Sequence, residues 1–253
     1  MTGDLALCAE ENLLAFAEAW ALASGGERWR RDGMLFVASG APMRAFNNVV
    51  ITDVTPRLRG NLCEAIGAFA RRGVPFRVRL RDALAPGAAN ALSASGLALQ
   101  GRIPCLVMSP IVESGAPPAV EIHPVEDAAT LRHHVEAVAG AFGWQPDRLA
   151  EVFTERLLED GRWRAYTGYA GGKPVASSQL MLSDGNAGIY YVGTLEAYRR
   201  RGYGEALTRH AVREAARAGC DSVSLQASPM GLPIYERMGF RTIGAYDGFV
   251  QEA

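Results

Sequence analysis

Arginine and glycine are closely spaced in one segment of the chain, RRRGYG at 199–204. Its pattern is Arg199-x-x-Gly202-x-Gly204, between the strand-like run YYVGTL and a helix-like run. Glycines at the start of a helix let a ligand approach the backbone closely, and the first-turn N–H groups have no partner within the helix. The positive end of the helix dipole and the arginine charges add to this effect. The segment therefore predicts a binding site for a pyrophosphate.

The spacing in this segment differs from that of other phosphate-binding motifs. A Walker loop needs G-x-x-x-x-G-K-[ST], and the dinucleotide fingerprint is G-x-G-x-x-G. A nucleic-acid patch is also disfavoured, because the basic cluster is short and has no aromatic stacking partners arranged around it. The formal net charge of the whole chain is −1, which gives no general attraction to nucleic acid or to a membrane.

A second segment that could do chemistry is LPIYERMGF at 232–240, where Tyr235 lies on a predicted short helix followed by Gly-Phe. A tyrosine hydroxyl can donate a proton to a leaving group. The alternative is a core tyrosine whose hydroxyl is hydrogen-bonded, which is the ordinary situation of a buried tyrosine.

The two segments, in this order and among these strands, resemble the GNAT acetyltransferases (GCN5-related N-acetyltransferases) from Val120 to Ala253. The resemblance implies an α+β protein with the GNAT acyl-CoA N-acyltransferase fold. It also implies an acetyl-CoA-dependent N-acetyltransferase that acts on a primary amine, with Tyr235 donating a proton to the departing CoA thiolate. Cofactor-binding backbone groups are then expected at Val192, Gly193 and Thr194 for the pantetheine arm, and at Arg199, Arg200, Arg201, Gly202, Tyr203 and Gly204 for the pyrophosphate.

The chain departs from the family's pattern at several positions. Ser228 stands where the family often has asparagine, and a serine hydroxyl can still bond the backbone or the cofactor. Thr194 and Glu196 stand where the family usually has a hydrophobic residue and a proline. Glu196 is our candidate general base, and the alternative is a solvated acid that balances the arginines beside it. Tyr190, Tyr191 and Gln226 could orient the acceptor or a water molecule.

The acceptor itself is left open by the sequence: it could be an amino acid, a polyamine, an antibiotic or a protein N-terminus. Two other functions remain as alternatives, a non-catalytic acyl-CoA-binding sensor and an acyl-CoA-dependent O-acyltransferase. The expected partner is a small-molecule or peptide amine, with no nucleic acid and no membrane, and the protein could be a monomer or a homodimer.

The elements around these residues follow a strand and helix pattern. Residues 127–142 and 146–158 each carry apolar residues at helical spacing. Three alternating strands follow, with hairpin turns at Gly171-Gly172 and Asp184-Gly185. A strand–helix–strand crossover comes next, so we expect a mixed sheet.

The first half of the chain repeats this order of elements, with helices closed by glycine, alternating strands and a helix opened by proline. We therefore predict a tandem duplication, with a degenerate domain at 1–112, a linker at 113–119 and a catalytic domain at 120–253; the alternative is a generic likeness, because strand–helix units are common. The first copy has Gly60 alone, followed by Asn61 and Leu62 where a pyrophosphate needs bare backbone. We expect it to lack a cofactor site and to serve as a scaffold, with one wall of the acceptor site.

The composition is that of an ordinary globular protein, since 49% of the 253 residues are hydrophobic and 21% are charged. The N-terminal segment has Leu13, Phe16 and Trp20 at helical spacing, interrupted by acids. It predicts an amphipathic surface helix, and neither a signal peptide nor a membrane span. The four cysteines lie far apart and show no zinc-ligand spacing, so we expect free thiols in a reducing cytosol and no metal site.

Histidines and aromatic residues offer weaker candidates. His133 and His134 are adjacent on a predicted helix, so they face different sides and should not share a site. Phe142, Trp144 and Trp163 could line an acceptor pocket, although aromatic residues near helix ends more often belong to the core.

Overall fold

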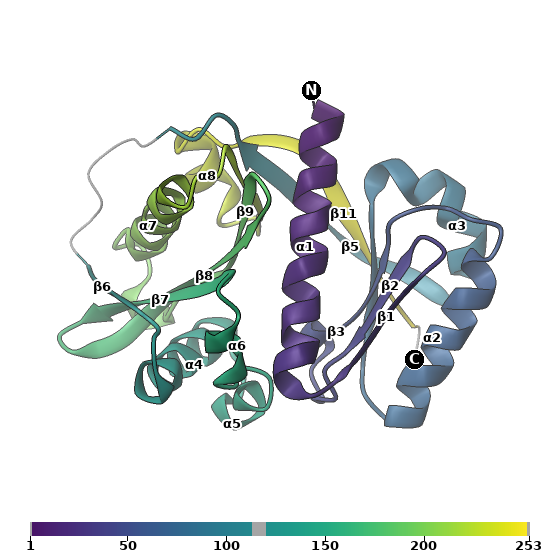
Figure 1. Ribbon diagram of the computed structural model, residues 1–253, viewed down its shortest axis with the longest axis horizontal. Helices are drawn as coiled ribbons and strands as arrows, with labels where there is room; N and C mark the ends of the chain where they lie inside the picture. Colours follow the sequence, from purple (N-terminus) through teal and green to yellow (C-terminus); the bar gives the residue numbers. More distant parts are fainter. Residues whose placement is uncertain (1, 113–119, 252–253) are drawn as a thin grey trace.

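The computed structural model describes residues 2–112 and 120–251, which form an 11-stranded sheet with helices packed on both of its faces (Figure 1). The predicted linker, residues 113–119, lies outside the described residues. The N-terminal half contains α1 (Thr2–Ser24), β1 (Glu27–Arg31), β2 (Met34–Ala38), η1 (Arg44–Phe46), β3 (Asn47–Ile51), α2 (Leu58–Arg72), β4 (Arg77–Arg81), η2 (Asp82–Leu84), α3 (Ala85–Ala94) and β5 (Leu97–Met108). The C-terminal half contains β6 (Glu121–Pro124), α4 (Ala128–Phe142), α5 (Pro146–Ala150), α6 (Arg156–Glu159), β7 (Trp163–Ala170), β8 (Lys173–Ser183), β9 (Asn186–Thr194), η3 (Glu196–Tyr198), α7 (Tyr203–Arg217), β10 (Ser222–Gln226), α8 (Leu232–Arg237) and β11 (Arg241–Gln251).

The two halves repeat one topology, as the sequence predicted. Each has three antiparallel strands, a helix, a strand parallel to the third one, a second helix and a final strand. In the first half this unit runs from β1 to β5, and in the second it runs from β7 to β11. The fold is therefore a mixed α+β architecture in two copies.

The final strands of the two halves are exchanged. The strand order is β1-β2-β3-β4-β11-β5-β10-β9-β8-β7-β6, so β11 pairs with β4 of the first half and β5 pairs with β10 of the second. The two exchanged strands also pair with each other, antiparallel, from Arg241 opposite Val107 to Gln251 opposite Leu97. The halves are thus joined through continuous backbone hydrogen bonding across the middle of the sheet.

The helix α1 is buried between the two halves, and our prediction of a surface helix is wrong. It packs against the second half through Phe16 and Trp20 and against the first half through Leu14 and Ala17 (Figure 1). It has two apolar faces rather than one. Its polar residue Asn12 is fully buried. Two hydrogen bonds satisfy its amide there: it donates to Met181 O at 2.9 Å and accepts from Tyr190 Oη at 2.8 Å.

The region after α4 also differs from the prediction. The expected single helix at 146–158 is two short helices, α5 and α6, with a turn between them. In that turn the adjacent side chains of Val152 and Phe153 are both buried. The Thr154 hydroxyl donates to Ala23 O at the end of α1. In addition, α8 begins at Leu232 rather than near Pro229.

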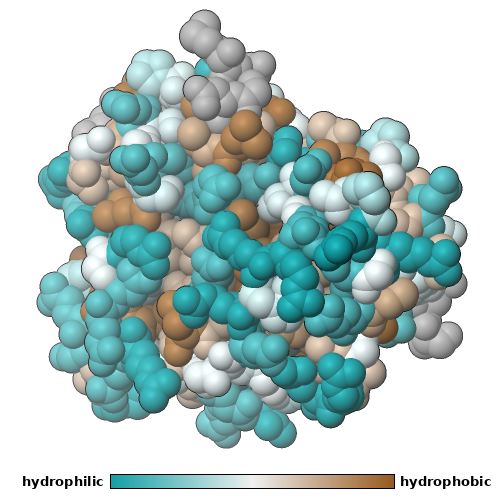
Figure 2. Space-filling view, turned by 45° about the vertical axis from the view of Figure 1, so that its right-hand side comes forward, coloured by the Kyte–Doolittle hydropathy of each residue, from teal (hydrophilic) through white to brown (hydrophobic). Residues whose placement is uncertain are grey.

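Hydrophilic residues cover most of the face in Figure 2, and hydrophobic residues appear there in small separate groups. Within the described ranges, no helix has the length and hydrophobicity needed to cross a bilayer.

Candidate functional site

The strands β9 and β10 separate at one end of the sheet and leave part of β9 without a partner on that side. Their parallel pairing stops at Ile189 opposite Leu225, whereas β9 continues to Thr194. On its other side β9 still pairs with β8, with Gly193 opposite Ser177. The equivalent strands of the first half pair to the end of β3, at Ile51 opposite Leu80. The second half alone therefore offers backbone N–H and C=O groups at such a gap.

A β-bulge shapes the start of this gap. The register of β9 against β8 shifts between Tyr190 and Gly193, and Tyr191 has a φ of 46°. The Ser177 hydroxyl donates to Tyr191 O at 2.9 Å and holds the bulge. Positive φ is costly for a residue with a side chain, and such strain is often found at functional sites.

The turn at 199–204 provides the predicted backbone donors. Arg200 and Gly202 both have positive φ, 59° and 79°, in the turn that leads into α7. Within the described chain, the N–H groups from Arg200 to Gly204 donate to no backbone carbonyl. Such a run of free N–H groups at a helix N-terminus forms an anion-binding concavity.

Gly204 is not required by the fold itself. A Cβ atom built on it would lie 3.6 Å from Thr194 Oγ1 and 3.8 Å from Val192 Cγ1, which is ordinary contact. A methyl group here would project toward Val192 and Thr194 at the end of β9. Gly193, in contrast, allows α4 to pack closely, since its Cβ would lie 2.6 Å from Ala141 Cβ.

The three arginines of the turn make different contacts. Arg199 donates to Thr194 O and Ala141 O, and so ties the end of β9 to the end of α4. The Arg201 guanidinium lies 5.3 Å from the centre of the Tyr198 ring and donates to Ala197 O. Arg200 is exposed and forms no ion pair with a described residue.

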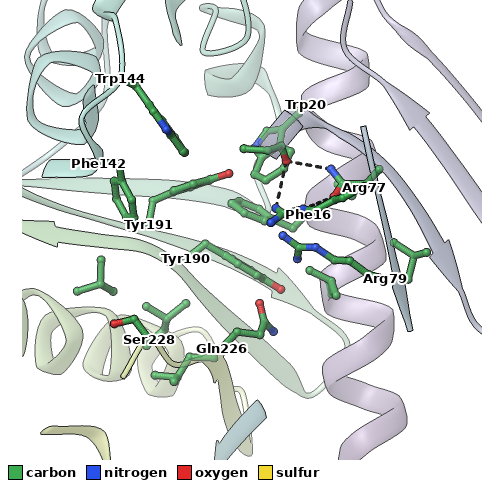
Figure 3. A pocket seen from close by; sticks show the side chains of 18 of the residues that line it. Phe16, Trp20, Arg77, Arg79, Phe142, Trp144, Tyr190, Tyr191, Gln226 and Ser228 are labelled. Carbon is green, nitrogen blue, oxygen red and sulfur yellow. Dashed lines mark hydrogen bonds between the residues drawn. The ribbon is translucent and has the colours of Figure 1, made fainter. Parts of the chain in front are cut away.

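A cavity of about 330 Å³ opens beside the gap, and both halves of the chain line it. Its walls are largely aromatic, with Phe16 and Trp20 from α1 and Tyr190 and Tyr191 from β9 (Figure 3). The Tyr190 ring stacks on Phe16 at 3.6 Å between ring centres. The same cavity reaches Tyr235, so the predicted reactive tyrosine lies next to the gap.

Tyr235 is buried on α8, and its ring contacts Phe240 edge-on at 6.0 Å between centres. Burial raises its pKa to about 12, while a hydrogen bond with Thr208 acts in the opposite direction. A Cβ atom on Gly231 would lie 2.8 Å from the Tyr235 ring, so a glycine is needed there for the ring to lie where it does.

Other predicted residues are placed as follows. Gln226 and Ser228 line the cavity, and the Ser228 hydroxyl accepts a hydrogen bond from Gly231 N at 3.2 Å. Glu196 is exposed in η3 and is not among the residues that line the cavity. Phe142 and Trp144 line it, whereas Trp163 lies in the core.

The two adjacent histidines lie in different surroundings, as predicted. His133 is exposed beside the Tyr169 hydroxyl, and His134 is fully buried. No cluster of three metal-ligating side chains occurs in residues 2–112 and 120–251.

Sequence reasoning missed two arginines of the first half, Arg77 and Arg79, which line the cavity from β4 (Figure 3). The alternation RVRLR at 77–81 was the available signal, because it places charged residues on one face of a strand. Only the docking of the two halves shows that this face lines the cavity beside Tyr235.

Comparison with known proteins identifies a family domain in the half of the chain that contains the gap and Tyr235. Residues 118–231 match the family model for the acetyltransferase (GNAT) domain. A search of curated proteins finds no match. A GCN5-related N-acetyltransferase from Kribbella flavida has a similar structure, with 20% identity, a TM-score of 0.71 and coverage of 95% of each chain.

Two further structures share the fold. A GCN5-related N-acetyltransferase from Sphaerobacter thermophilus has 20% identity and a TM-score of 0.59, covering 86% of this chain and 76% of its own. A tandem GNAT protein from the clavulanic acid biosynthesis pathway has 13% identity and a TM-score of 0.57, covering 87% and 80%. The family model thus identifies a GNAT acetyltransferase domain in the C-terminal half, and the three solved structures share the fold of most of the chain.

Proposed function

We propose that the protein is an acetyl-CoA-dependent N-acetyltransferase that acetylates the primary amine of a small-molecule or peptide acceptor. Acyl transfer is the chemistry of the family, and the acetyl group, the amine and the residue roles are our proposal. The observation that carries it is the gap between β9 and β10, which has the free N–H groups of the turn 199–204 at one end and Tyr235 beside the adjoining cavity.

In this proposal the backbone holds most of the cosubstrate. The N–H groups from Arg200 to Gly204 bind the pyrophosphate, and Val192, Gly193 and Thr194 pair with the amides of the pantetheine arm. Arg199, Arg201 and Tyr203 shape the turn, and Ser228 lies at the cavity wall.

The chain's residues then support direct attack by the amine. The acceptor nitrogen forms a bond to the thioester carbonyl carbon, the carbon–sulfur bond breaks, and Tyr235 donates its proton to the sulfur. A backbone N–H at the end of β9 stabilises the developing oxyanion. The amine must lose a proton, and none of the cavity-lining residues is an aspartate or glutamate. We therefore propose that water carries this proton, with Glu196 as the candidate base.

The test is a titration with acetyl-CoA followed by thermal unfolding, with NAD as a comparison. Ligand at a hundredfold excess over its dissociation constant should add about 2.7 kcal/mol to the unfolding free energy. Gly204→Ala should fold normally, because its new methyl has room within the protein, and should lose most of the shift.

Gly60→Ala is the matched control, because Gly60 lies near the start of the equivalent helix α2 and its Cβ would contact nothing within 4 Å. It should keep the full shift. If wild-type protein shows no shift at millimolar acetyl-CoA, the acyltransferase proposal is wrong.

A further inference from the structure

The strand β4 carries arginines on the face that lies toward α1. Val78 and Leu80 point the other way, into the core with α2 and α3. Arg81 forms an ion pair at 2.8 Å with Glu10, a buried residue of α1. Arg77 donates to the amide oxygen of Asn48 at 2.9 Å, so its guanidinium has only neutral partners. Arg79 lies between Arg77 and Arg81 in the strand, and its guanidinium has neither an acidic nor a neutral hydrogen-bond partner among the described residues.

Arg79 is a cation without a counter-ion in the described part of the chain. Its Nε is buried and makes no hydrogen bond with a described residue, and the ionisable side chains that act on its pKa are the tyrosines Tyr190, Tyr191 and Tyr246. Burial lowers the pKa of Arg79, but an arginine stays charged in a protein. Buried polar groups are normally paired, so an unpaired guanidinium that lines a cavity points to a ligand that completes it.

Two other cavity residues also present buried donors without acceptors. Among the residues that the structure describes, Trp20 Nε1 and Gln226 Nε2 have no hydrogen-bond partner. An indole N–H can only donate, and the amide NH₂ of glutamine is likewise a donor. Since no aspartate or glutamate of the described ranges lines the cavity, its polar groups are suited to an acceptor-rich, negatively charged ligand. Its aromatic walls, formed by Phe16, Trp20, Trp144 and Tyr191, suit an apolar body (Figure 3).

We infer that the acetyl acceptor is an amine that also carries a carboxylate, an amino-acid-like compound with an apolar body, and that Arg79 binds the carboxylate. This inference rests on the proposed function. Arg79 enters the cavity from the first half, and Ser228 lies on the opposite side (Figure 3). An acceptor held in this way has its carboxylate at the first half and its amine near Tyr235. The guanidinium fork matches the two carboxylate oxygens.

The charge of the cavity also selects against other amine acceptors. Polyamines and aminoglycosides carry several positive charges and would meet Arg77 and Arg79 with no acidic residue in the lining to offset the repulsion.

Binding is tested first, without turnover. Phenylacetate at 10 mM should raise the melting temperature of wild-type protein, and phenylacetamide at the same concentration should not. Arg79→Gln should lose the phenylacetate shift and keep the acetyl-CoA shift. The variant should also melt no lower than wild type without ligand, because an unpaired buried charge has been removed. Arg59→Gln is the matched control, since Arg59 is exposed on α2 of the same half.

Turnover then separates the inference from the proposed function. The twenty protein amino acids and their amides are compared as acceptors with acetyl-CoA, beside spermidine and kanamycin. We expect the free acids to be preferred, and Arg79→Gln to raise KM for the best acid by about thirtyfold or more, with a smaller change in kcat. Arg79→Lys should restore part of the loss.

Three results would overturn the inference: amides acetylated as well as acids, preference for spermidine or kanamycin, or no phenylacetate shift together with no active amino acid. Each would leave the acetyl-CoA shift intact. Loss of that shift in wild type would instead defeat the proposed function.

Discussion

Burial raises the pKa of Tyr235 to about 12, and the hydrogen bond with Thr208 lowers it by a smaller amount. Because the folded-state pKa lies above the ordinary value of about 10, the hydroxyl stays protonated as the pH rises through the range where enzymes work. The residue is therefore able to donate a proton, and its own ionisation should not limit activity below about pH 10.

Tyr235→Phe tests this role at the residue scale. We expect kcat to fall by roughly a hundredfold or more, because the thiolate must leave without a proton donor, while the affinity for acetyl-CoA stays nearly unchanged. The measurement is the release of CoA thiol between pH 6 and pH 10, beside a calorimetric titration of acetyl-CoA. Unchanged turnover would remove Tyr235 from the mechanism. Binding without any turnover in wild type would favour the acyl-CoA sensor.

Sequence indicates candidate residues most directly where they lie in one contiguous segment, and the roles given to them stay predictions. The turn 199–204 and Tyr235 each belong to a local motif, and both lie at the gap or its cavity. Arg79 was not predictable, because its position beside Tyr190 depends on how strands far apart in the chain come together. Glu196 remains a prediction, since its exposed carboxylate lies outside the cavity lining.

At the scale of elements, α4 is joined to the sheet through a buried polar network. His134 Nδ1 lies 3.2 Å from Thr167 Oγ1, and its Nε2 lies 3.0 Å from Gln179 Nε2. The Gln179 amide oxygen accepts from Trp163 Nε1 at 3.3 Å, so the glutamine NH₂ faces the histidine and requires a neutral ring nitrogen. Burial lowers the pKa of His134 to about 3, and a hydrogen bond to the Tyr166 backbone acts weakly against this.

This network should make the fold sensitive to acid. The folded-state pKa of His134 lies below the unfolded value near 6.5, so its neutral form contributes stability above about pH 6.5, which is lost as the pH falls toward 3. The unfolding free energy should drop by up to about 1.4 kcal/mol per pH unit from this group. Denaturant unfolding at pH 7.5 and pH 5 measures the slope.

His134→Gln should reduce that slope, and His133→Gln, which alters the exposed neighbour, should leave it as in wild type. An equal slope in the His134 variant would show that other groups cause the acid sensitivity.

The positions of the helices and strands were predicted well from the sequence, and the burial of these elements was predicted less well. The strands, hairpins and most helix ends follow from alternation, glycine and proline, which act locally. The burial of α1 does not follow, because Glu10 and Asn12 read as solvent-facing residues. Their partners, Arg81 and the Met181 carbonyl, come from distant strands.

At the scale of the whole molecule, the exchanged strands make each half incomplete without the other. The tandem repeat could be predicted from the sequence, but the exchange of the two final strands could not, because each final strand would also fit the sheet of its own half. Residues 113–253 alone would lack β5, leaving β10 and β11 without a shared neighbour, and would lack α1 over the apolar face of the sheet.

We therefore expect residues 113–253 expressed alone to be aggregated or unfolded, and to become soluble when residues 1–112 are co-expressed as a separate chain. Size-exclusion chromatography and circular dichroism measure this outcome. A stable monomer of 113–253 that still responds to acetyl-CoA would show that the strand exchange is dispensable.

The exchange of the strands β5 and β11 affects how the protein behaves on dilution. A cavity built between two separate subunits falls apart once their concentration drops below the dissociation constant. Here both halves belong to one polypeptide, so each sees the other at an effective concentration on the order of millimolar, whatever the amount of protein present. The walls around Tyr190 and Arg79, which come from the two halves, thus stay assembled within one polypeptide at any dilution.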